Sequence, residues 1–91
     1  MSIEEMTEET ADREMILFDR NYETIKAVLW ESPRSDFDLF REPIREIYDN
    51  IIRHYRAGLV SDKEMEYYES RRIEICHRII EAEERVAVPT L

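Results

Sequence analysis

The sequence predicts an all-α protein, a three-helix antiparallel bundle that forms a single domain over residues 1–91. Apolar residues recur at alternating spacings of three and four along three long segments, which is typical of helices that each bury one face. One glycine and three prolines in 91 residues leave little material for connections or strands. We expect helices over about residues 7–31, 36–57 and 62–85, with residues 1–6 and 87–91 as frayed tails.

The first predicted helix has an apolar seam along one side. Its N-terminus should be capped by Ser2, Thr7 or Thr10, because a hydroxyl accepts a hydrogen bond from a free amide of the first turn. Ser32 precedes Pro33, and a residue before proline is disfavoured in helical backbone, so the helix should end there. The seam between these two points consists of Ala11, Met15, Phe18, Tyr22, Ile25 and Leu29.

The second predicted helix should fold back against the first, because the link between them is short. Pro43 is either the first residue of its main part or a kink inside a longer helix. Beyond the proline, the helix has a broad apolar face that comprises Ile44, Ile47, Tyr48, Ile51, Ile52 and Tyr55.

The turn before the third predicted helix carries the clearest local signals. Gly58 is the only glycine and stands where a helix C-terminus favours positive φ. Ser61 and Glu64 have the spacing of a capping box, in which each side chain bonds the other residue's amide. The third helix then has a seam with an arginine in its middle: Met65, Tyr68, Arg72, Ile75, Ile79, Ala82 and Val86.

The apolar faces of the second and third helices are wider than a three-helix core needs. Exposed apolar stripes usually mark an interface, so we expect a homodimer or a helical protein partner. The main functional hypothesis is therefore a non-enzymatic interaction module, that is, a small regulator, adaptor or assembly protein. The expected interface residues are Trp30, Tyr48, Ile52, Tyr55, Tyr67, Ile73 and Ile80.

The net charge of −9 makes the protein acidic and disfavours direct binding to nucleic acid. It also supports an alternative function, an acidic inhibitor that mimics DNA and occupies the groove of a nucleic-acid-binding protein. Eleven arginines stand against two lysines, and glutamine is absent. This bias is compatible with a thermophilic source, although a GC-rich genome would produce the same arginine excess.

The second alternative is a dimeric ferritin-like metal site or a small-anion-binding helical enzyme. Glu74 and His77 have the i, i+3 spacing of ferritin-like metal sites, which would here require a dimer; a solvated helix face is the simpler interpretation. Arg72 is either an anion anchor within a pocket or a structural residue, whose side chain extends along the edge of the core to solvent or pairs with a carboxylate of the first helix such as Glu23 or Asp19. We expect no catalytic residues and no cofactor, which leaves a non-enzymatic protein favoured.

The order and length of the helices are similar to those of the small all-helical chorismate mutases, including the turn at Gly58. The active site of that family needs several inward-facing arginines and a lysine, some of them on its long first helix. Arg13, Arg20 and Lys26 do not have the family's spacing. The similarity of outline therefore implies no particular activity for this chain.

The expected location is the cytoplasm. Cys76 is the only cysteine, so no disulfide can form within the chain, and a reducing compartment is the default. No apolar run has the length of a membrane span, and the first residues are acidic where a signal peptide would be basic. We therefore expect no membrane association.

Overall fold

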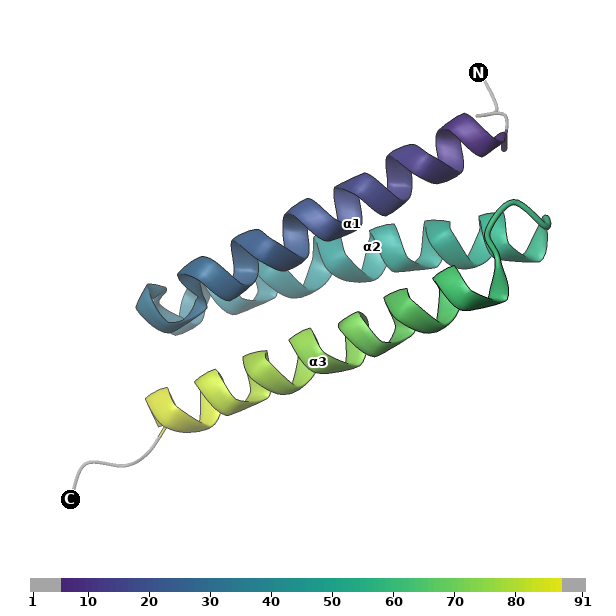
Figure 1. Cartoon of the computed structure of the whole chain (residues 1–91). Coiled ribbons are helices and arrows are strands. Elements are labelled where there is room, and N and C mark those ends of the chain that lie inside the picture. Colours follow the sequence, from purple (N-terminus) through teal and green to yellow (C-terminus); the bar gives the residue numbers. More distant parts are fainter. Residues whose placement is uncertain (1–5, 88–91) are drawn as a thin grey trace.

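The computed structural model describes residues 6–87, which form three helices packed in an antiparallel bundle (Figure 1). None of these residues lies in a strand. The predicted fold class is thus confirmed, and the predicted frayed tails fall almost wholly outside the described residues. The helices are α1 (Glu8–Val28), α2 (Phe37–Arg56) and α3 (Asp62–Ala87), with short 3₁₀ turns at Leu29–Glu31 and Arg34–Asp36.

Helix α1 begins at a capping box formed by two threonines. The amide of Thr10 donates to Oγ1 of Thr7 at 3.2 Å, and the amide of Thr7 donates to Oγ1 of Thr10 at 2.8 Å. Glu8 and Glu9 lie in the first turn, where negative charge is favourable to the helix dipole. Of the predicted caps, Thr7 is therefore the one used.

The chain reverses direction between Leu29 and Phe37. The hydroxyl of Ser32 donates to the carbonyl of Val28 at 2.8 Å, and Pro33 prevents the helix from continuing. Pro43 lies inside α2, so it is not the first residue of this helix. Its missing amide leaves the carbonyl of Leu39 without a helical partner, and this turn is tolerated because Leu39 faces solvent, with 68% of its surface exposed.

The turn between α2 and α3 has the geometry that the sequence predicts. Gly58 has a φ of 81°, and its amide donates to the carbonyl of Tyr55. The amide of Leu59 donates to the carbonyl of His54, which completes a Schellman motif. Ser61 and Glu64 exchange both hydrogen bonds of the predicted capping box, at 3.0 and 3.1 Å. The end of α2 and the start of α3 are thus fixed by local bonds.

The core forms where the three predicted seams meet. Phe18 of α1 is fully buried at its centre, with its ring 5.2 Å from that of Tyr68 in an edge-on contact and 6.5 Å from that of Tyr48. The other core side chains with 2% exposure or less are Ala11, Ile25, Leu29, Phe37, Ile44, Ile51, Ile75, Ile79 and Ala82. These residues hold the relative rotation of the helices and thereby decide which side chains face outward.

His54 is the one charged or polar side chain among the buried residues of the described chain, with 7% of its surface exposed. Its Nδ1 lies 2.7 Å from the carbonyl oxygen of Asn50, which can only accept, so Nδ1 carries a proton. Its Nε2 lies 3.0 Å from Oγ1 of Thr10. The ring therefore links α2 to the capped start of α1.

Replacement of Gly58 by alanine should destabilise the protein by about 1 kcal/mol, because an L-residue at positive φ is strained. No atom lies within 4 Å of the position that a Cβ would occupy, so the loss would come from the backbone and not from a clash. Gly58→Asn should lose less, since asparagine tolerates this conformation better. Urea unfolding of the three proteins measures the difference, and an alanine variant as stable as the wild type would contradict this account of the turn.

Candidate functional site

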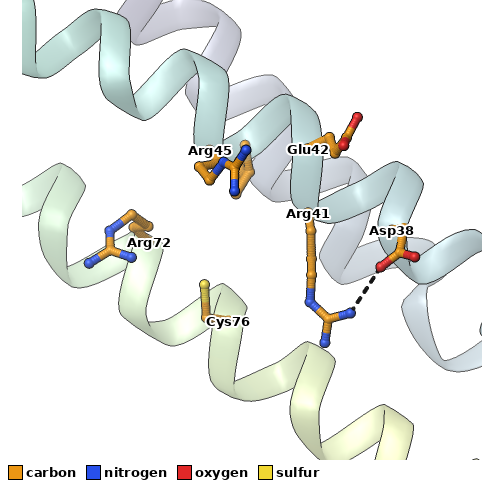
Figure 2. A pocket seen from close by; sticks show the side chains of 7 residues that line it. Asp38, Arg41, Glu42, Arg45, Arg72 and Cys76 are labelled. Carbon is orange, nitrogen blue, oxygen red and sulfur yellow. Dashed lines mark hydrogen bonds and ion pairs between the residues drawn. The ribbon is translucent and has the colours of Figure 1, made fainter.

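A cleft of about 330 Å³ lies between α2 and α3 (Figure 2). Helix α2 contributes one edge of the cleft, because residues 38, 41, 42 and 45 recur at helical spacing on the side that faces α3. Helix α3 contributes Arg72 and Cys76, one turn apart. Its complete lining is Asp38, Arg41, Glu42, Ile44, Arg45, Arg72 and Cys76.

Two exposed isoleucines of α3 lie beside this cleft. Ile73 and Ile80 have 44% and 46% of their surface exposed. They come three residues before and four residues after Cys76, so they share the side of α3 on which the cleft opens. We refer to Ile73 and Ile80 as the isoleucine pair.

The other exposed residues of the predicted interface lie elsewhere on the molecule. Tyr67 is on the edge of α3 that faces α1, because the guanidinium of Arg71 contacts the rings of both Tyr67 and Tyr22. Trp30 follows α1 and lies under the guanidinium of Arg85, 5.2 Å away. Tyr55 is at the turn after α2, where its hydroxyl donates to Asp62. The predicted interface residues therefore do not form one patch.

Two residues of the predicted interface belong to the core or its edge. Tyr48 is only 9% exposed, because its ring is covered by Phe18 on one side and by the guanidinium of Arg72. Ile52 is half-buried and packs against the core cluster. Neither side chain is a free surface in this structure, so the face that we propose for binding does not rest on Tyr48 or Ile52.

Arg72 has no carboxylate partner among the described residues. Its guanidinium lies 4.7 Å from the centre of the Tyr48 ring, a cation–π contact, and its Nε is buried without a hydrogen-bond acceptor. The two carboxylates proposed as its partners are engaged otherwise: Glu23 pairs with Arg71 at 3.4 Å, and Asp19 accepts from Tyr68 at 3.2 Å. Of the alternatives for Arg72, an ion pair with Glu23 or Asp19 is therefore not formed in this structure.

Arg41 is the arginine of the cleft whose guanidinium is paired with carboxylates. It donates to Glu83 of α3 and, at 3.3 Å, to Asp38 one turn earlier on α2 (Figure 2). The bond from Arg41 holds the pKa of Glu83 below its ordinary value. Arg41 thus bridges α2 and α3 at the cleft, whereas the described chain places no carboxylate against Arg45.

Glu74 and His77, the candidate metal ligands, do not lie in a group with further ligands among the described residues. Glu74 accepts a hydrogen bond from the hydroxyl of Tyr22 at 2.6 Å and another from Arg78 at 3.1 Å. His77 is exposed. Within residues 6–87, no three side chains of His, Cys, Asp or Glu are grouped as a metal site would require. Glu74 belongs to the contact between α1 and α3.

Sequence reasoning gave no role to Arg41, Arg45, Asp38 or Glu42, which line the cleft. The sequence shows only that these four residues recur at helical spacing beside the apolar face of the second predicted helix. That spacing predicts a charged edge but not which helix lies across it. Only the packed structure brings this edge opposite Arg72 and Cys76.

Comparison of the chain with known protein families, with curated proteins and with solved structures finds no match. Among the described residues, no helix is both long enough and apolar enough to cross a membrane.

The contact between α1 and α3 should weaken in acid. The hydrogen bond from Tyr22, followed by that from Arg78, lowers the pKa of Glu74 below its ordinary value of 4.5, although partial burial opposes the shift. A carboxyl whose pKa is lower in the folded state stabilises the protein above the pKa of the unfolded state. This stabilisation is lost as the pH falls through the folded value.

Glu74→Gln should therefore lower the free energy of unfolding at neutral pH and flatten its decline below about pH 5. Urea unfolding as a function of pH measures both effects. Glu69→Gln is the control, because Glu69 is an exposed glutamate of the same helix. Parallel pH profiles for the wild type and Glu74→Gln would contradict the assignment.

Proposed function

We propose that the protein is a helical interaction module that binds a partner protein through the face of α2 and α3, with a second copy of the chain as its partner. The observation that supports the proposal is the isoleucine pair beside the cleft. Ile73 and Ile80 are seven residues apart, so their side chains extend from the same side of α3, two turns apart. A helix of a partner that packs along α3 would cover both.

The exposed area of Ile73 and Ile80 determines how much free energy their burial would contribute to a dimer. Complete burial of an isoleucine contributes about 1.5–3 kcal/mol, so the exposed part of each side chain offers roughly 1 kcal/mol. A symmetric dimer would bury four such side chains and gain roughly 4 kcal/mol. A micromolar complex needs about 8 kcal/mol, so the surrounding charged surface must contribute the remainder.

The charged residues around the isoleucine pair can supply this electrostatic part of the free energy of association. The cleft presents Arg45 and Arg72 without carboxylate partners, whereas α3 exposes Glu66, Glu69 and Glu84. A second copy therefore supplies the carboxylate partners that Arg45 and Arg72 lack. Like charges along α3 oppose a direct α3 to α3 pairing, so we expect α3 of one copy to lie over the cleft of the other.

The proposal predicts that Ile73→Asp combined with Ile80→Asp abolishes self-association, because two carboxylates would lose their hydration in the interface. Sedimentation velocity from about 1 µM to about 1 mM protein covers the range in which a weak dimer dissociates. Ile16→Asp is the matched control, since Ile16 is the same residue type with 53% exposure but lies on α1.

A wild-type protein that remains monomeric over this range would contradict the homodimer. Loss of association in Ile16→Asp but not in the double variant would place the interface on α1. The acidic-inhibitor alternative makes a different prediction, since binding through the acidic surface would weaken steeply with added salt. A contact that depends on the isoleucine pair should weaken less with salt, because salt screens only the part of its free energy that comes from charges and leaves the part from apolar burial.

A further inference from the structure

We propose that the cleft between α2 and α3 binds an amphiphilic organic monoanion, namely a carboxylate attached to an apolar body, with Arg45 and Arg72 holding its negative charge. This inference goes beyond the docking function. It concerns the interior of the cleft and not the isoleucine pair on its edge. Arg45 and Arg72 are also the arginines over which the proposed dimer would place α3 of a second copy, so the ligand and a second copy would compete for them.

Arg72 supplies the first argument. Its Nε is buried and lacks an acceptor among the described residues, and buried polar atoms in folded proteins are nearly always bonded. The carbon of the guanidinium lies 4.7 Å from the centre of the Tyr48 ring, and no described carboxylate pairs with Arg72, so its terminal N–H groups are the donors left for an anion. Arg72 therefore has both a positive charge and hydrogen-bond donors that no carboxylate of the described chain uses.

The charges of the lining supply the second argument. Three arginines and two carboxylates line the cleft, which leaves one net positive charge. Arg41 and Asp38 are bonded to each other, so Arg45 and Arg72 are the cations left to the ligand. A dianion such as phosphate would exceed this net charge and would be repelled by Glu42, whereas a single carboxylate matches the net charge.

The floor of the cleft supplies the third argument. Ile44 is 2% exposed and lies at the bottom with Cys76, whose thiol behaves as a small apolar group. Figure 2 shows arginines on both helices around this floor. The volume of about 330 Å³ is at the lower end of the range known for small-molecule sites. A ligand with an apolar body a few carbons long fits this combination.

Nuclear magnetic resonance of the arginine side chains tests the proposal directly. Octanoate, a single-charge carboxylate with an alkyl chain, should shift the Nε–H resonance of Arg72 saturably as it is added up to about 10 mM. The amide of Cys76 should move in parallel. Octanol, which has the same alkyl chain without charge, and inorganic phosphate, which has charge without an apolar body, are the ligand controls.

Variants then assign the contacts. Arg45→Ala and Arg72→Ala should each weaken octanoate binding by about tenfold or more, because each removes a charged hydrogen bond. Arg72→Lys should also weaken it, since lysine lacks the planar fork. Arg45 is exposed, so its removal should leave folding intact even if the Arg72 variants are unstable. Arg20→Ala on α1 removes the same charge from a distant exposed site and should leave binding unchanged.

Three results would overturn the inference. The first is an Arg72 resonance that does not respond to octanoate. The second is an equal response to phosphate or octanol, which would show that the apolar body or the charge is not recognised. The third is a shift of Arg72 on dilution of the protein alone that added octanoate does not change, which would show that a second copy and not a small anion occupies the cleft.

Discussion

The packing of Phe18 between Tyr48 and Tyr68 is the contact on which the rest of the structure depends. The phenylalanine comes from α1 and the two tyrosines come from α2 and α3, so one cluster fixes the rotation of all three helices. With that rotation set, Tyr68 reaches Asp19, and Tyr22 reaches Glu74. The side of α3 toward α1 is therefore closed by long polar side chains, whereas the side toward α2 contains the cleft.

Arg72 connects the core to that cleft. It occupies a seam position at which a hydrophobic residue would have been expected, and its guanidinium covers the ring of Tyr48 from the solvent side. The arginine thus completes the apolar packing with its face and its aliphatic stem, while it keeps hydrogen-bond donors without acceptors. A stability role and a binding role are compatible in one side chain because they use different parts of it.

Local features of the fold were predictable from the sequence, because the interacting groups are close along the chain. Gly58 and the Ser61 capping box are determined within a few residues. The interface residues were less predictable, since the spacing of apolar residues defines a face without revealing which helix covers each edge. The apolar face of the second helix therefore includes Tyr48 among the expected interface residues, although this side chain is only 9% exposed and contacts Arg72 in the structure. The unpaired state of Arg72 likewise depends on the competing contacts of Asp19 and Glu23.

Methyl spectra of isoleucine-labelled protein recorded over a range of concentrations test most directly whether the α2–α3 face is the functional one. Ile73 and Ile80 report on the edge of the cleft, Ile44 reports on its floor, and Ile16 reports on an exposed site of α1. The account predicts that the methyl signals of Ile73 and Ile80 shift as the concentration rises and that the signal of Ile16 does not. A shift of Ile16 with Ile73 and Ile80 unchanged would contradict it.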